Sequence, residues 1–136
     1  MTTSASEGEK MINTFQDIKN AVLIDHDMFD TLAHPAWFME WAKFNMKIVQ
    51  EFQDNAIYLR NVGRRTVYGA DVILGKMRWD SEVRGDDEFK INSQAASFLS
   101  RLIMAANEEC EELFRTRKGG GNESNAEALL EWISEE

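Results

Sequence analysis

The sequence predicts a compact, mainly α-helical domain with a minor two-stranded β element. Along several segments, apolar residues recur at spacings of three and four, the period of a helix that buries one face. Only one proline and eight glycines interrupt the 136 residues, and 43% of the chain is hydrophobic, which is enough for one core. A short segment, 88–92, alternates polar with apolar residues instead, and this period predicts a strand.

The first two predicted helices follow a polar start. Residues 1–10 are small and polar, and we expect them to be disordered. The apolar residues of segment 11–24 predict a helix of about three turns. A second helix is predicted over 35–53, because Pro35 suits a first helical turn and a broad aromatic stripe follows it. Together with the apolar residues of two later helices, this stripe predicts a core. Its residues are Trp37, Trp41, Phe44, Ile48, Leu74, Met77, Phe98 and Leu102.

The middle of the chain predicts alternating elements. A turn is expected over 54–65, either alone or with a short helix at Ala56–Leu59. Thr66 would then cap a helix over 67–83 with Trp79 on its buried side. After the strand at 88–92, a third long helix is predicted over 93–106. The acidic stretch 108–112 is expected to be a loop. The last middle segment, 113–118, is predicted as a second strand.

A glycine-hinged tail completes the predicted organisation, in which 11–118 form a single domain. Gly119–Gly121 is a flexible hinge, and Ser124 begins a capping-box pattern that predicts an acidic helix in the tail, residues 119–136. Its apolar face is a docking device, either for its own domain or for a partner. The residues of this face are Leu129, Leu130, Trp132 and Ile133.

Charge is distributed unevenly along the chain, whose net charge is −9. Residues 60–118 carry eleven basic and ten acidic side chains, whereas the segments on either side are acidic. The overall charge argues against bulk nucleic-acid binding but leaves room for a local basic face. The lone cysteine and the start of the chain fit a reducing cytoplasm, and we expect no membrane span.

The predicted order of helix, helix, strand, helix and strand is that of a winged helix. In such a fold the third helix enters the major groove, and here Gln94, Ser97 and Arg101 share one side of it. A mobile basic wing would lie on phosphates, and its candidates are Arg115, Arg117 and Lys118. The alternative is that these residues are the ordinary polar side of a surface helix.

Other candidate sites are weaker. A second basic cluster either binds phosphate or pairs with the acidic residues interleaved with it, and it comprises Arg60, Arg64, Arg65, Lys76, Arg78 and Arg84. His26 and His34 do not have a zinc spacing. Cys110 lies among four glutamates, which would raise its pKa rather than activate it. We therefore expect no enzyme, no metal and no cofactor.

Three short motifs carry a resemblance. Met77-Arg78-Trp79, Asp87 to Asn92 and Leu113 to Arg117 resemble the Arg-Trp, Phe-Lys-Ile/Leu-Asn and Phe-x-x-Arg pattern of small proteins encoded by phages and prophages. The resemblance covers residues 35–118. It implies a winged-helix-like fold and an origin in a mobile element, and it implies no activity.

These observations lead to two functional hypotheses. The first is a non-enzymatic DNA-binding regulator or accessory protein of phage type, which uses the third helix and the basic wing. The second is an acidic protein-binding inhibitor of a host system that acts against host defence or mimics DNA. A phage or host protein, DNA or a second copy of the chain are the expected partners. The hypotheses differ in the surface used. The first requires Gln94, Arg101, Arg115 and Arg117 to be exposed on one face, and the second requires a contiguous acidic face from the N-terminal segment, Glu108–Glu112 or the tail.

Overall fold

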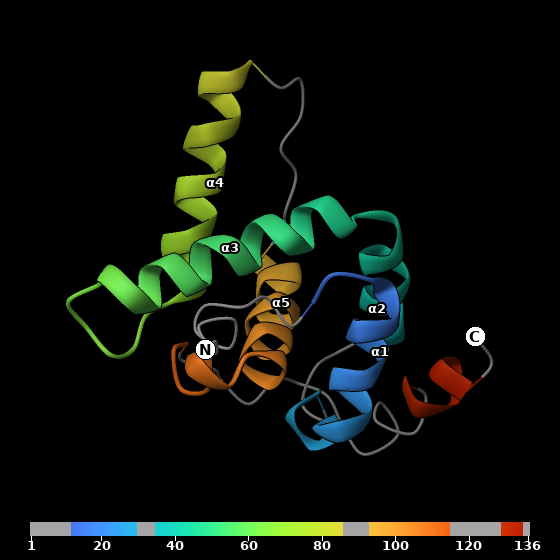
Figure 1. Cartoon of the computed structure of the whole chain (residues 1–136). Helices are drawn as coiled ribbons and strands as arrows, with labels where there is room; N and C mark the ends of the chain where they lie inside the picture. Colours follow the sequence, from blue (N-terminus) through green and yellow to red (C-terminus); the bar gives the residue numbers. More distant parts are fainter. Residues whose placement is uncertain (1–11, 30–34, 86–92, 115–128, 135–136) are drawn as a thin grey trace, which may run out of the picture.

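The chain folds into helices packed around a single core (Figure 1). A computed structural model describes residues 12–29, 35–85, 93–114 and 129–134. The helices with described bounds are α1 (Phe15–Ile24), α2 (Pro35–Phe44), α3 (Met46–Val62), α4 (Ala70–Arg84) and α5 (Ser93–Ala106). Two short 3-10 helices, η2 (His26–Phe29) and η3 (Glu108–Cys110), follow α1 and α5. Residues 129–134 are also helical.

The predicted β element and the winged-helix fold are wrong. No strand forms in the described part of the chain, where the β pairing is one isolated bridge between Tyr68 and Phe114. The Tyr68 N–H donates to the carbonyl oxygen of Leu113 at 2.7 Å. Leu113 and Phe114 are both buried, so the alternation that a half-exposed strand requires is lost at this point. Segments 88–92 and 115–118 lie outside the described residues.

Helix α5 occupies the centre of the fold and confirms the third predicted helix. It contacts all four other long helices, and Figure 1 shows it in the middle of the molecule. Phe98 is fully buried, and its ring lies 5.6 Å from that of Phe38 and 5.8 Å from that of Phe29. Full burial of such a side chain contributes about 1.5–3 kcal/mol. The other fully buried side chains of α5 are Leu99, Leu102 and Ile103.

The predicted helix over 35–53 is two helices, because Asn45 interrupts it. The Asn45 side chain donates to the Trp41 carbonyl oxygen at 2.7 Å, which closes α2. The Asn45 carbonyl oxygen then accepts hydrogen bonds from the backbone N–H groups of Ile48 and Val49 in the first turn of α3. Trp37 and Phe44 are 54% and 75% exposed, so their prediction as core residues is wrong. The buried side of α2 consists instead of Phe38, Met39 and Ala42.

The remaining core predictions have mixed outcomes. Leu74, Met77, Phe98 and Leu102 are buried, as predicted, whereas Trp41 and Ile48 are only partly buried. The turn predicted over 54–65 is wrong as far as Val62, because α3 continues to that residue and includes the short helix considered at 56–59. The helix expected from residue 67 begins at Ala70 instead.

The tail helix packs on its own domain. Leu129 and Ile133 belong to the core, and Leu130 is partly buried. The Trp132 ring meets the Phe15 ring edge-on, with centroids 5.9 Å apart. The apolar face predicted for a partner is therefore covered largely by α1 and the core. Residues 119–128, including the predicted hinge, lie outside the described residues.

A buried amide connects three distant parts of the chain. Gln53 is fully buried on α3, and its side chain accepts from the Ile12 N–H at 3.0 Å and donates to the Ile12 carbonyl oxygen at 2.9 Å. The same Gln53 oxygen accepts from the Asn107 side chain at 3.0 Å. Asn107, just beyond α5, also donates to the Ile103 carbonyl oxygen. The segment before α1 and the end of α5 are thus held to α3.

We predict that Gln53→Ala lowers the free energy of unfolding by about 2–5 kcal/mol, because it leaves buried polar groups unpaired and opens a cavity. Gln50→Ala is the matched control, since Gln50 lies on the same helix and donates to Asn13 in an exposed position. The control is expected to cost about 1 kcal/mol or less. Urea denaturation of both variants measures the difference, and equal losses would contradict the role of Gln53.

Alanine substitutions at two glycines, Gly75 within α4 and Gly85 just after it, should change the free energy of unfolding in opposite directions. Gly75→Ala should raise the free energy of unfolding by about 0.5–1 kcal/mol, because the added methyl group meets nothing within 4 Å in a helix interior. Gly85→Ala should lower it by about 1 kcal/mol, because Gly85 ends the helix at a φ of 80°. Thermal denaturation of the two variants would refute this explanation if both shifts had the same sign.

Candidate interaction surface

Helix α4 carries apolar residues on two opposite faces. Its inner face is buried against the domain through Ile73, Leu74, Met77 and Ser81. On the opposite side, Val72 is 48%, Trp79 70% and Val83 71% exposed. At about 100° per residue these three positions fall on one line along the helix. We call Val72, Trp79 and Val83 the outer stripe.

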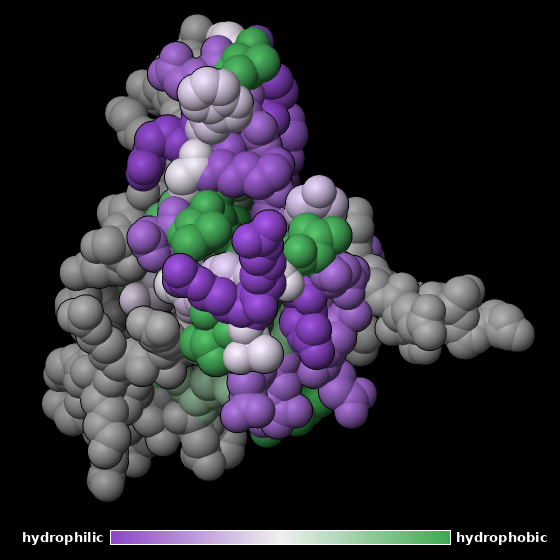
Figure 2. Space-filling view, turned by 90° about the vertical axis from the view of Figure 1, so that its left-hand side faces the viewer, coloured by the Kyte–Doolittle hydropathy of each residue, from purple (hydrophilic) through white to green (hydrophobic). Residues whose placement is uncertain are grey.

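The outer stripe lies on a projecting element. In Figure 1 the last turns of α4 rise away from the other helices. Figure 2 views the molecule from the side and shows separate hydrophobic patches, interrupted by hydrophilic side chains, over this projection and the body below it. Gly75 is exposed on the same side of the helix and adds no bulk there.

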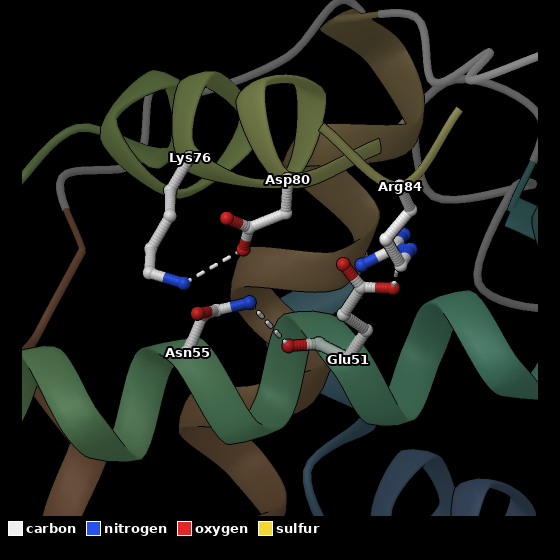
Figure 3. Close-up of polar contacts among 5 residues, drawn as sticks. All are labelled: Glu51, Asn55, Lys76, Asp80 and Arg84. Atoms are coloured by element: carbon white, nitrogen blue, oxygen red, sulfur yellow. Dashed lines mark hydrogen bonds and ion pairs between the residues drawn. The ribbon is translucent and has the colours of Figure 1, made fainter. Parts of the chain in front are cut away.

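Charged and polar groups border α4 on the side of α3 (Figure 3). The Lys76 ammonium lies 2.8 Å from an oxygen of Asp80, and Arg84 lies 3.9 Å from Glu51 of α3. In Figure 3 the Asn55 side chain points from α3 toward the Lys76–Asp80 pair. These contacts favour the paired alternative for part of the second basic cluster. They make the border of α4 a polar rim rather than a phosphate site.

Three other members of the second basic cluster lie at or just beyond the end of α3, whereas Arg78 is exposed on α4. The Arg60 side chain donates to the Glu109 carbonyl oxygen at 2.9 Å, which links α3 to η3. Arg64 and Arg65 are exposed in the connection to α4. The Arg65 backbone N–H donates to the Tyr68 hydroxyl, so this connection is held in place. The structure does not gather the six basic residues into one patch.

Arg101, one of the residues predicted to read DNA, is not exposed on α5. Arg101 is only 4% exposed, and its guanidinium donates to the Ser97 carbonyl oxygen at 3.1 Å. Burial lowers the pKa of Arg101. Ser97 is half-buried. The prediction that Arg101 is available to a base edge is therefore wrong, because the helix that carries it is the centre of the core.

Several predicted residues fall outside what the structure describes. The Gln94 side chain is among them, as are Arg115, Arg117 and Lys118. In the described part of the chain, no group of three or more histidine, cysteine or acidic side chains could hold a metal. None of the described helices is long and apolar enough to cross a membrane.

The only cysteine is placed where it cannot act as a nucleophile at neutral pH. Cys110 is fully buried in the core. Burial raises the pKa of Cys110 to about 11, the nearby Glu109 carboxylate adds to this effect, and Arg60 opposes it. A thiol with such a pKa is almost entirely protonated near pH 7.

A second exposed apolar patch lies on α2. Trp37 and Phe44 occupy one side of that helix, and the Trp37 ring packs edge-on against Phe38 with centroids 4.9 Å apart. The α2 patch is shorter than the outer stripe, because α2 has 10 residues and α4 has 15. Sequence reasoning missed both patches, since it placed Trp37 and Trp79 in the core.

Comparison with protein families, with curated proteins and with solved structures finds no match for this chain.

We predict that Cys110 makes the protein less stable in alkaline solution. The unfolded thiol loses its proton near pH 9, whereas the folded thiol keeps it until about pH 11. The stabilisation is therefore complete below pH 9 and declines as the pH rises toward 11. Between pH 8 and pH 10.5 the wild-type protein should lose about 2 kcal/mol more than Cys110→Ala. Urea denaturation at both pH values tests this, and parallel losses in the two proteins would contradict it.

Proposed function

We propose that this protein is a non-enzymatic protein-binding domain whose partner docks on the outer stripe of α4. The observation that carries the proposal is the second apolar face of α4. Its inner face already attaches the helix to the domain, so folding does not require Val72, Trp79 and Val83 to be apolar. Their exposure leaves apolar area in water, which a docked partner would cover.

The residue types on α4 also support a protein partner. Tryptophan is enriched among the residues that dominate protein–protein binding energy, and Trp79 lies within a line of smaller apolar side chains. Charged side chains of both signs border the outer stripe, as in a polar interface rim. An exposed apolar line along one side of a helix is typical of helices that dock on a partner protein.

DNA binding through the third helix has no support in this arrangement, since α5 is enclosed. An acidic protein-binding surface is compatible with the structure, because Glu108, Glu111 and Glu112 are exposed at and beside η3. These glutamates are charged, whereas the outer stripe of α4 offers the large apolar side chain of Trp79. The outer stripe is therefore the preferred contact.

The test compares two exposed tryptophans. Immobilised wild-type protein, Trp79→Ser and Trp37→Ser are incubated with lysate of the source cells, with and without nuclease treatment, and the retained proteins are identified by mass spectrometry. We expect a protein that is retained by the wild type and by Trp37→Ser and lost with Trp79→Ser. Retention that depends on Trp37, or that vanishes on nuclease treatment, would contradict the proposal.

A further inference from the structure

We propose that the surface of the domain beneath the tail helix is a second docking site, which binds an acidic amphipathic helix of a partner protein in place of the tail. We call Phe15 and Lys19 of α1, together with Lys43 of α2, the tail-binding surface. This surface lies on other helices than the outer stripe of α4. Three features carry the inference: the way the tail is attached, its position in the fold, and the charges beneath it.

The tail helix is held to the domain by apolar and aromatic contacts alone. Leu129 is fully buried, Ile133 is 8% exposed, and the Trp132 ring meets the Phe15 ring edge-on. In the described part of the chain, no hydrogen bond or ion pair joins residues 129–134 to another element. Apolar contact is non-directional. A different helix with the same spacing of apolar side chains can therefore take the place of the tail.

The position of the tail allows it to leave while the rest of the domain stays in place. Figure 1 shows the tail helix at the edge of the molecule, and its aromatic contact is with α1. Helix α1 is held independently of the tail, because it packs on α5 and buries Ile18 and Val22. The segment before α1 is bound to Gln53 through Ile12. Release of the tail therefore uncovers Phe15 without removing the contacts that hold α1.

The tail-binding surface carries two positive charges beside one aromatic ring. The ammonium groups of Lys19 and Lys43 lie 5.6 Å and 6.0 Å from the centre of the Phe15 ring. Among the described residues, no carboxylate lies within ion-pair distance of Lys19, and Glu131 of the tail is exposed. An acidic side chain on an incoming helix would therefore find a cation at Lys19 that the described part of the tail does not use. Complementary charge of this kind favours an acidic partner over a basic one.

The tail itself indicates what the partner helix looks like. Its apolar residues Leu129, Trp132 and Ile133 have the spacing i, i+3 and i+4 of a helix that docks into an apolar surface. The partner helix has apolar side chains at the same spacing and an acidic side chain that reaches Lys19. The tail has the advantage of its tether, which gives an effective concentration on the order of millimolar. The additional ion pair at Lys19 is what allows a partner to compete with it.

The first experiment measures binding of a fluorescein-labelled synthetic peptide with the sequence of residues 122–136 to the whole chain by fluorescence anisotropy. In the chain, Leu129→Ser with Ile133→Ser should release the tail. This variant should bind the peptide at least about tenfold more tightly than the wild type, whose own tail competes for the surface. Ser134→Ala, at an exposed tail position, is the matched control and should bind like the wild type. Circular dichroism measures the helical content of each variant.

The second experiment tests the charge of the surface in the variant with the released tail. Addition of Lys19→Glu should weaken peptide binding about three- to tenfold, because like charges then meet in the complex. Arg64→Glu makes the same change of charge at an exposed position beyond α3 and should leave the affinity unchanged. A peptide whose five glutamates are replaced by glutamine should also bind the released variant about three- to tenfold more weakly.

Each outcome supports or overturns one part of the inference. A large loss of helical content in Leu129→Ser with Ile133→Ser would overturn displacement, because the tail would then be required for the fold. Equal peptide affinity of this variant and the wild type, or no binding to either, would overturn the docking site. An affinity that does not change with Lys19→Glu would overturn the acidic partner. Trp79→Ser should leave peptide binding unchanged, so these results are independent of the outer stripe.

Discussion

The side-chain amide of Gln53 is the constraint on which the arrangement of the helices depends. An amide can donate and accept at once, and Gln53 uses both functions on the backbone of Ile12 while its oxygen also accepts from Asn107. Gln53 lies on α3, and its two partner residues belong to the segment before α1 and to the end of α5. Because the site is fully buried, no water replaces a lost partner, so the three segments have to meet in one register. Apolar packing alone would bring these segments together without fixing their register.

Fixing these segments places α5 at the centre and determines what remains for α4. Helices α1 and α3 pack on α5, and α4 packs against both α3 and α5 along one of its own faces. Arg84 of α4 lies close to Glu51 of α3, and Lys76 pairs with Asp80 within α4. Exposed pairs of this kind contribute little to stability, so the inner apolar face of α4 is what holds it. The opposite face is left without a role in folding, and this separation is what allows it to serve an interface.

The sequence predicts the helices better than it predicts which side of each helix is buried. The third helix and its buried residues Phe98 and Leu102 are found from spacing alone, because that helix is enclosed and its pattern is unbroken. The end of α3 is missed, because the polar residue Gln53 occupies a core position and makes the apolar pattern seem to stop. The break at Asn45 is missed too, because aromatic residues lie on both sides of it. The predicted strand at 113–118 fails at Leu113 and Phe114, where local alternation was outweighed by burial of both side chains.

The candidate surface was hidden from sequence reasoning for a related reason. Trp79 was assigned to the core because tryptophan is usually buried, yet the spacing of Val72, Trp79 and Val83 already differs from that of Ile73, Leu74 and Met77. Two apolar lines that fall on opposite sides of one helix cannot both face the same domain, unless the helix is enclosed. The structure shows that α4 is at the edge of the fold and α5 at its centre. An apolar residue therefore indicates an interface only when its helix is known to lie at the edge of the fold. Helix α4 lies there, so its outer apolar residues can be assigned to an interface.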